Sequence, residues 1–190
     1  MGKNKSVKAD KGSLELAFRR EIYEWIHCLV IALIICVILF VFVVRIIDVS
    51  GTSMNPTLNN GDKMLVSNLF YKPKAGDIVV FKADNYDPNK ALVKRVIATE
   101  KQEINIDFGK GIIYVDGQPI EEDYIAELTT TKLDFIGPKT VPDNCVFVLG
   151  DNRNMSTDSR KAEIGMVDER QIIGKVYWVI FPLSEFGWVY

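Results

Sequence analysis

Hydrophobic residues are distributed in two different ways along this chain, one before and one after about residue 45. From residue 26 to residue 44 the sequence IHCLVIALIICVILFVFVV is apolar on every side, and only His27 in it can carry a positive charge. A helix of these 19 residues, at about 1.5 Å per residue, nearly matches a bilayer core of about 30 Å. A water-soluble helix would show a polar face at a period of 3.6. The pattern therefore predicts a transmembrane helix over residues 26–44.

Beyond residue 46 the apolar runs are short, mostly β-branched or aromatic, and separated by turn residues. Seven strands are predicted, at residues 63–67, 77–81, 91–99, 103–107, 111–115, 145–149 and 172–181. Asp116-Gly117 is a hairpin signal, and residues 118–144 have the weakest pattern and are expected to leave the sheet. No sustained helical period follows the apolar span. We therefore expect a mainly β domain, folded as a coiled antiparallel sheet or a barrel-like sheet system.

Positive charges predict the orientation of the apolar span. Six lysines and arginines precede it, whereas only Arg45 closely follows it; the six are Lys3, Lys5, Lys8, Lys11, Arg19 and Arg20. Because such residues remain on the cytoplasmic side of a membrane, the N-terminus is expected to be cytoplasmic. A cleavable signal peptide ending near residues 49–51 is the rival interpretation, but secretory apolar regions extend to about 15 residues and this one is longer. An uncleaved anchor is therefore favoured.

These patterns divide the chain into three parts. Residues 1–25 form a basic cytoplasmic tail and pre-helix, in which residues 1–13 are expected to be disordered; residues 26–44 form the transmembrane helix; and residues 46–190 form the extracytoplasmic domain. The last part ends in an aromatic tail, for which core packing is the commoner explanation and a surface patch at the bilayer the alternative. The aromatic tail comprises Tyr177, Trp178, Phe181, Phe186, Trp188 and Tyr190.

Composition excludes several classes of protein. With 48% hydrophobic and 25% charged residues the chain is expected to fold. Three cysteines cannot build a disulfide-rich scaffold, and a single histidine excludes zinc sites that need two. The formal charge of −2 combines six basic and four acidic residues in residues 1–25 with 17 basic and 21 acidic residues afterwards. A nucleic-acid-binding surface is therefore not expected.

Directly after the apolar span, the segment SGTSMNPT at residues 50–57 is rich in hydroxyl groups. A turn of this composition is usually structural, and a serine in it that attacked a substrate would need a base. His27 is the only histidine and lies at the other membrane face, which excludes a Ser-His-Asp triad and a Cys-His pair with Cys145. The remaining candidate is a lysine whose pKa is lowered by burial, because the unperturbed pKa of about 10.4 keeps lysine protonated.

Two strand lysines are candidates for this base. In ALVKRVIA, period-2 alternation puts Lys94 on one face with Leu92 and Val96, and the adjacent Arg95 adds a repelling charge. Lys175 in IIGKVYW also has apolar neighbours on its face. Since most strand lysines extend to solvent at an edge, the alternation does not decide between the two.

The polar loop GDNRNMSTDSR at residues 150–160 directly follows a predicted strand. It is only superficially similar to a calcium loop, because Arg153 and Met155 stand where oxygen ligands are needed. Its structural interpretation is a turn held by side-chain hydrogen bonds and an Asp158–Arg160 ion pair. A functional loop would use the same groups, with a hydroxyl bound to the lysine amine.

Taken in order, these segments resemble the bacterial, single-anchor type I signal peptidases. After the anchor come SGTSMNPT, GDIVVF at residues 76–81, LVKRVI at 92–97, GDNRNMSTDSR, and VIFPLSEFG at 179–187, so that the resemblance extends from about residue 24 to the end. It implies a membrane-anchored serine endopeptidase that removes signal peptides after small residues, at Ala-x-Ala sites, through a Ser-Lys dyad and an acyl-enzyme. No metal or cofactor is implied. The implied partners are secretory preproteins, the lipid bilayer and the neighbourhood of the secretion translocon.

The resemblance also implies residue roles. Ser53 would be the nucleophile and Lys94 the general base, which decides between the two lysines, and Ser156 would orient the Lys94 amine. The implied supporting residues are Asp158, Arg160 and Arg95 as an ion-pair network, with Asp151 and Asn152 shaping the loop. The candidates for shallow substrate pockets are Val49, Leu58, Leu92 and Val93.

Three positions depart from the family pattern. The backbone N–H of Ser53 would form part of the oxyanion hole, but the side-chain hydroxyl that some members add two residues earlier is replaced here by Gly51. The lysine block continues as KRVIATEKQ instead of KRVIGxPGD, and the serine loop ends SRKAEIG instead of SRxxG. Strand or turn lengths are expected to differ at the last two positions.

Two other functions remain open. One is the same Ser-Lys chemistry on another target, either self-cleavage or one dedicated pilus or spore-coat precursor. The other is a membrane-tethered β-domain that binds peptides without cutting them. The presence of both Ser53 and Lys94 argues against the second.

Overall fold

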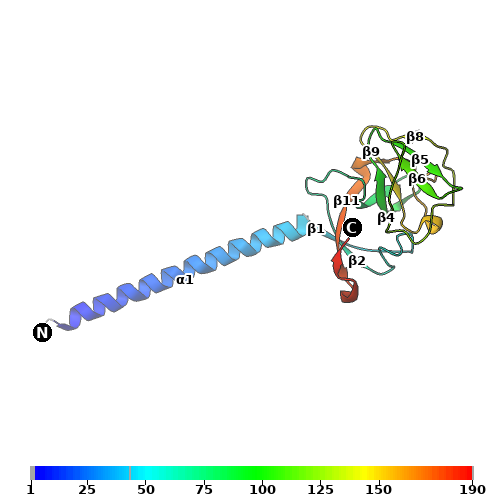
Figure 1. Cartoon of the computed structure of the whole chain (residues 1–190). Helices are drawn as coiled ribbons and strands as arrows, with labels where there is room; N and C mark the ends of the chain where they lie inside the picture. The colour runs from blue at the N-terminus through cyan, green and yellow to red at the C-terminus, as the bar shows by residue number, and fades with distance from the viewer. Residues whose placement is uncertain (1–2, 43, 190) are drawn as a thin grey trace. The chain divides into compact units, whose positions relative to one another are not determined.

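The computed structural model describes residues 3–42 and 44–189, with side chains at 16–38 and 44–189, in two compact units divided after residue 43. The first unit is one helix, α1 (Lys3–Phe42), shown in Figure 1. Its stretch Leu16–Ile38 has a mean hydropathy of 2.1, is not buried in the protein, and is long and apolar enough to cross a membrane. The apolar segment predicted from the sequence is thus helical up to Phe42, and residue 43 lies outside the described residues.

The expectation of disorder over residues 1–13 is wrong for residues 3–13, which are helical. The four lysines and the alanine of this segment are good helix formers. A helix that is already nucleated gains one hydrogen bond for each residue added. Extension of α1 from its apolar part therefore accounts for the helical start at Lys3. Residues 1 and 2 lie outside the described residues.

The second unit is mainly β, as predicted. Its strands are β1 (Val44–Asp48), β2 (Lys63–Ser67), β3 (Ile78–Ala83), β4 (Asp87–Ala98), β5 (Glu103–Asp107), β6 (Ile112–Val115), β7 (Gln118–Pro119), β8 (Lys139–Thr140), β9 (Cys145–Leu149), β10 (Val167–Asp168), β11 (Ile172–Phe181) and β12 (Gly187–Trp188). Three short 3₁₀ helices complete it: η1 (Arg153–Met155), η2 (Glu169–Gln171) and η3 (Leu183–Glu185). All seven strands expected from the sequence are present. Those not expected are four strands of two residues each and β1, which begins at Val44, the residue predicted to end the transmembrane helix.

The larger sheet has eight strands in the order β1-β2-β11-β3-β4-β9-β10, and β12 pairs with β11 (Figure 1). Every strand pairing in it is antiparallel. Its path of hydrogen-bonded strands has two ends among the described residues, so the sheet is not closed into a barrel. The barrel-like form expected from the sequence is therefore corrected to an open sheet.

One strand of this sheet keeps an unpaired edge. β4 pairs with β3 from Asp87 to Arg95, whereas on its other side it pairs with β9 only from Arg95 to Ala98. In the described part of the chain, residues 87–94 therefore have one side without a partner strand. Such an edge presents unpaired N–H and C=O groups that can bind another extended chain.

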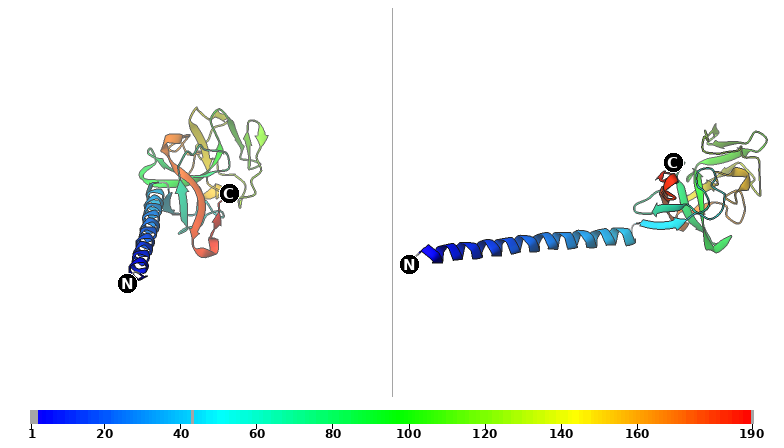
Figure 2. Two further views of the ribbon diagram at one scale, coloured as in Figure 1. Left: turned by 90° about the vertical axis from the view of Figure 1, so that its left-hand side faces the viewer. Right: turned by 90° about the horizontal axis from the view of Figure 1, so that it is seen from below.

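A smaller sheet of four strands, in the order β7-β6-β5-β8, lies beside the larger one in Figure 2. The segment 118–144, expected to leave the main sheet, supplies its two-residue strands β7 and β8 and otherwise forms turns and loops. Phe135 and Val141 of this segment are buried against Phe147 of β9. The segment is thus an excursion with its own core contacts.

Three clusters of buried hydrophobic residues stabilise the second unit. Val79 and Phe81 of β3 belong to one cluster, whereas Ile78 and Val80 belong to the next, so β3 is buried on both faces. β9 is also covered on both faces, with Val148 in the first cluster and Phe147 in the third. Burial of both faces explains why these two strands are continuously apolar in the sequence instead of alternating.

The described aromatic tail is partly at the surface, since Tyr177 and Trp178 are half-buried and the other three residues are exposed. Phe181, Phe186 and Trp188 are each more than half exposed. Trp188 contacts Trp178, with ring centroids 4.3 Å apart. The alternative of a surface patch therefore holds for these residues, while Tyr190 lies outside the described residues. The sequence pattern could not separate the two because aromatic residues serve in both places.

The third cluster allows a test of the packing. Phe135 is 1% exposed and makes edge contacts with Phe108 and Phe147, at 6.0 and 5.7 Å between ring centroids. Phe135→Ala is expected to lower the free energy of unfolding by about 3–5 kcal/mol, because it leaves a cavity between the two sheets. Denaturant unfolding of the full chain in detergent measures this loss. Phe186→Ala, at an exposed position, is the control and should change it by less than about 0.5 kcal/mol; equal losses would contradict the packing.

Candidate active site

The turn between β1 and β2 presents Ser53 at the surface of a cleft. Met54 and Leu58 are buried in the second cluster, and Leu58 N–H donates to the Met54 carbonyl, so that the turn is anchored from below. From the loop at residues 150–160, Asn152 donates its backbone N–H to the Ser53 carbonyl at 3.1 Å and its side-chain amide to the Thr52 carbonyl at 3.0 Å. Two segments about 100 residues apart thus hold the serine in place.

Lys94 lies directly beside this serine. Its Nζ is 2.8 Å from Ser53 Oγ and 2.8 Å from the Val93 carbonyl oxygen. The side chain is buried, and Leu92 and Val96 on the same face of β4 belong to the first cluster, as the alternation predicts. The serine and lysine singled out from the sequence are therefore in hydrogen-bond contact.

Burial changes the protonation of this lysine. Loss of hydration is the largest cause that lowers the pKa of Lys94 to about 8, since burial disfavours a charged amine. The positive charge of Lys90 lowers this pKa further, whereas the carboxylates of Asp158 and Asp151 oppose the shift. A neutral amine that can accept a proton is therefore available near pH 8.

The other candidate lysine has a different environment. Lys175 Nζ forms an ion pair with the Asp77 carboxylate, which also accepts a hydrogen bond from the Tyr71 hydroxyl at 2.8 Å. Burial and this carboxylate raise the pKa of Tyr71. Lys175 is thus part of a structural cluster between β11 and the segment before β3, and no contact joins it to Ser53 in the described part of the chain.

A buried ion pair connects the lysine strand to the serine turn. Arg95 binds Asp151 through two hydrogen bonds, of 2.9 and 2.7 Å, and both side chains are almost fully buried. Arg95 also donates to the Gly76 carbonyl at 2.9 Å. Thr57, in the serine turn, donates its hydroxyl to the same Asp151 carboxylate. This pair therefore links the three segments that carry Lys94, Ser53 and the loop.

A second buried pair shapes the loop itself. Asp158 accepts two hydrogen bonds from the Arg160 side chain, each of 2.8 Å, and one from Gly150 N–H at 3.1 Å. Arg160 also donates to the Arg153 carbonyl and to the Thr131 carbonyl. The ion pair expected from the sequence is present, and it folds the loop back onto its own start.

Ser156 is buried close to this site, but its hydroxyl has no hydrogen-bond partner among the described residues. The Lys94 amine bonds to Ser53 and Val93, and not to Ser156. A side chain at Gly150 would place its Cβ 2.2 Å from Ser156 Oγ and 2.4 Å from the Ser53 carbonyl oxygen. Glycine is therefore required at residue 150 to let the serine turn and the loop approach each other.

The cleft beside Ser53 has a volume of about 410 Å³. It is lined by residues 47–54, Tyr86, residues 89–94, Met155 and Thr157, and thus by the end of β1, the serine turn and the unpaired part of β4. Of the predicted pocket residues, Val49, Leu92 and Val93 line it. Leu58 does not, because it is fully buried beneath the turn as a core residue.

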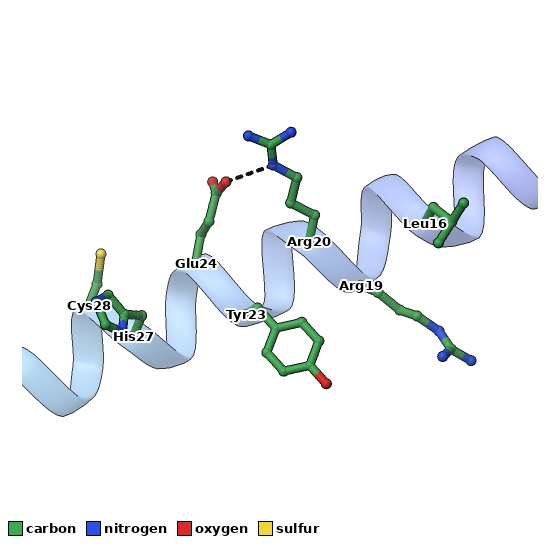
Figure 3. A pocket seen from close by; sticks show the side chains of 7 residues that line it. All are labelled: Leu16, Arg19, Arg20, Tyr23, Glu24, His27 and Cys28. Carbon is green, nitrogen blue, oxygen red and sulfur yellow. Dashed lines mark hydrogen bonds and ion pairs between the residues drawn. The ribbon is translucent and has the colours of Figure 1, made fainter.

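The first unit presents a different surface. Figure 3 shows the face of α1 that includes Arg20, Glu24 and His27; Arg20 and Glu24 form an ion pair at 3.1 Å. This face is an exposed helix surface on which His27 has no hydrogen-bond or ion-pair partner among the described residues. No group of three or more His, Cys, Asp or Glu side chains among the described residues could hold a metal ion.

A match over most of the chain identifies the protein family to which it belongs. The model of the family described as signal peptidase, peptidase S26, matches residues 22–181. The chain belongs to the signal peptidase family. It is 38% identical over 175 residues to the probable signal peptidase I-1 of Synechocystis sp., covering 87% of this chain and 86% of that protein. It is 34% identical over 186 residues to signal peptidase IB of Staphylococcus aureus, covering 88% and 94%.

A crystal structure of signal peptidase I from Enterococcus faecalis is also similar, with 28% identity and a TM-score of 0.47 over 55% of this chain and 97% of that one. The family match and the curated relatives confirm the resemblance drawn from the motifs. They also identify this signal peptidase as a serine endopeptidase of the signal peptidase type.

Sequence reasoning missed several residues of this signal peptidase that contact the site. Glu122 pairs with Arg153 at 2.6 Å, and the Tyr124 ring packs 3.9 Å from the guanidinium of Arg95. Both belong to the excursion, where no local pattern marks them. Asn154 of the loop accepts hydrogen bonds from backbone groups of the excursion at residues 130 and 131. The excursion therefore supports the loop at residues 150–160 from outside the main sheet.

Gly150 offers a test of this geometry. Gly150→Ala is expected to lower kcat about 100-fold or more, because the added Cβ must move Ser156 or the Ser53 backbone, and a displacement of about 1 Å can cost that much. Cleavage of a precursor peptide in detergent measures the rate. Gly187→Ala, whose Cβ would meet only an ordinary contact at 3.9 Å, is the control. Wild-type activity in Gly150→Ala would show that the two segments need not approach so closely.

Proposed function

We propose that this signal peptidase removes signal peptides from secretory preproteins through a Ser53–Lys94 dyad. The observation that carries the proposal is the 2.8 Å distance from Lys94 Nζ to Ser53 Oγ, joined to the lowered pKa of this lysine. A nucleophile and a base in hydrogen-bond contact are the minimum for acyl transfer by a serine.

The reaction proceeds in two steps. Neutral Lys94 takes the Ser53 proton as Ser53 Oγ attacks the scissile carbonyl, and the protonated lysine then gives that proton to the leaving amine, which yields an acyl-enzyme. Lys94 next takes a proton from water, the hydroxide attacks the ester, and Ser53 regains a proton as the signal peptide leaves. One lysine thus serves as base and acid in turn.

The oxyanion is held by backbone N–H groups of the serine turn. The Ser53 N–H has no hydrogen-bond partner among the described residues and is therefore available. Gly51 supplies no side chain, and its N–H already donates to the Asn60 side chain at 2.8 Å. The φ of Gly51 is +101°, a backbone conformation that favours glycine. Each oxyanion donor is worth about 2.7–4 kcal/mol in comparable hydrolases.

The substrate binds as an extended strand in the cleft. The unpaired edge of β4 at residues 87–94 offers backbone hydrogen bonds to such a strand, and the end of β1 lines the opposite side. Hydrogen bonds to the substrate backbone depend little on its side chains and therefore give little sequence specificity. Val49, Leu92 and Val93 line the cleft near the dyad and form the shallow apolar walls that select small residues, as in Ala-x-Ala sites.

The buried charges position the dyad. Arg95 and Asp151 hold the lysine strand and the serine turn together, Asp158 and Arg160 hold the loop, and Asn152 fixes the Ser53 carbonyl. Ser156 lies close to Gly150 and the Ser53 backbone, and its hydroxyl, which has no partner among the described residues, would orient the Lys94 amine during the reaction. These residues act through Ser53 and Lys94, since removal of a partner leaves a buried charge uncompensated.

The helix α1 anchors the enzyme in the cell membrane, with a cytoplasmic N-terminus and an extracytoplasmic catalytic unit. Its span Leu16–Ile38 is unburied and apolar enough to cross a membrane, four lysines precede it, and Arg19 and Arg20 lie near its start. A location at the bilayer near the secretion translocon suits a precursor that is itself held in the membrane. The same dyad could act on one dedicated precursor, and a binding domain that does not cut would not need a neutral lysine at its serine.

The dyad is tested by removing either member. Ser53→Ala and Lys94→Ala are each expected to lower kcat by at least about 1,000-fold, because each removes a group that takes part in bond making. The assay follows cleavage of a precursor with an Ala-x-Ala site by the full chain in detergent. Lys82→Ala, at an exposed position on the neighbouring strand β3, is the control. Unchanged cleavage in either dyad variant would refute the assignment.

The pH dependence tests the base. With the Lys94 pKa at about 8, the neutral fraction of this amine is about one tenth at pH 7 and about nine tenths at pH 9. The acylation rate is therefore expected to rise with pH through a single titration near 8 and then to level off. Rates of single-turnover cleavage between pH 6 and 10 measure the curve. A rate that stays at its maximum below pH 6 would exclude a neutral lysine as the base.

A further inference from the structure

The cleft contains a second lysine that the proposed mechanism does not use. Lys90 lies on β4 four residues before Lys94, on the same face by alternation, and both side chains line the cleft. The Lys90 side chain is exposed and forms no ion pair among the described residues. The one acidic residue in the lining, Asp48, is paired with Lys63 at 2.9 Å. Lys90 is therefore the unpaired charge of the cleft at neutral pH, apart from Lys94 itself.

The charge of Lys90 acts inside the cleft. It is one of the groups that lower the pKa of Lys94, next to the larger effect of burial. The opposing groups that face Lys94 are the carboxylates of Asp158 and Asp151, and each of these is bound by its own arginine. The positive charge of Lys90 that lowers the pKa of Lys94 also attracts or repels a charged side chain of a peptide bound in the cleft.

The spacing along β4 places Lys90 relative to the substrate. Successive residues of a strand advance by about 3.3 Å, so four residues correspond to about 13 Å. Val93 and Leu92 line the cleft between Lys94 and Lys90. A peptide that runs parallel to β4 with its scissile bond at Ser53 places the residues before the cut along these two, as the proposed function requires. The side chain that reaches Lys90 is therefore about four residues before the cleaved bond.

We propose that Lys90 is a specificity residue that favours precursors with an acidic side chain about four residues before the cleavage site and disfavours those with a basic one. This inference rests on the proposed function. A partly exposed ion pair changes kcat/KM by about twofold to fivefold. Lys90 would thus discriminate among precursors by charge, whereas the shallow pockets discriminate by size.

The test compares matched peptides that share one Ala-x-Ala site. Glu, Gln or Lys is placed at one position at a time, from three to six residues before the cut, and kcat/KM is measured with the full chain in detergent. Wild type is expected to prefer Glu over Lys at one of these positions. Lys90→Gln should remove this preference and Lys90→Glu should reverse it. Lys110→Gln, at an exposed lysine of the loop between β5 and β6, is the control and should behave as wild type.

The outcomes separate this inference from the proposed function. If wild type cuts none of the peptides, the proposed function fails. If the Gln peptides are cut but Lys90→Glu keeps the wild-type order of preference, only the role of Lys90 is overturned. That result is expected if the only role of Lys90 is to prevent the unpaired edge of β4 from pairing with another chain.

A second readout follows the field of Lys90 directly. On a peptide with Gln at these positions, Lys90→Gln should shift the midpoint of the acylation rate to higher pH, and Lys90→Glu should shift it further, because removal of a positive charge favours protonated Lys94. The shifts should shrink in high salt. An unchanged midpoint in Lys90→Glu would show that this charge does not act inside the cleft and would overturn the proposal.

Discussion

The structure depends on keeping one amine, that of Lys94, out of water and next to a serine hydroxyl. Burial of a lysine among apolar side chains disfavours its charged form. This loss of hydration is the main reason that the pKa of Lys94 is lowered to about 8. Among the described residues no carboxylate contacts this amine; Asp158 and Asp151 lie near enough to oppose the shift, but both are bound by arginines. The two buried ion pairs therefore have two effects. They join the segments around the dyad, and they keep the local carboxylates from holding the lysine fully protonated.

The open sheet provides the second requirement, a place for an extended substrate. Because β9 leaves β4 at Arg95, the residues that precede Lys94 keep free backbone groups on one side. The end of β1 faces the same cleft, and the serine turn closes one end of it. A peptide strand bound there would lie beside β4 and bring its carbonyl to Ser53. In the proposed function, the unpaired edge of β4 would bind the substrate next to Ser53 and Lys94.

Much of this arrangement follows from local sequence patterns. Alternation in ALVKRVIA identifies the face of Lys94, and strand periodicity locates seven of the eight strands that are longer than two residues, all except β1. The patterns fail where a residue's environment is set by distant segments. Leu58 was expected in a substrate pocket, yet it anchors the serine turn from below; Glu122 and Tyr124 have no local signal, yet they pack against Arg153 and Arg95.

The sequence by itself determined the apolar helix and the mainly β character of the second unit, and it directed the search for a base to lysine, because hydrophobic period and the lack of a usable histidine are local or compositional properties. It left Lys94 and Lys175 equivalent until the family resemblance was considered. Only the tertiary structure separates them physically. Lys175 meets the carboxylate of Asp77, whereas Lys94 meets Ser53, 41 residues away along the chain. Which groups surround a lysine depends on strand pairing and loop contacts between distant segments, and that environment decides whether its amine is an ion-pair partner or a base.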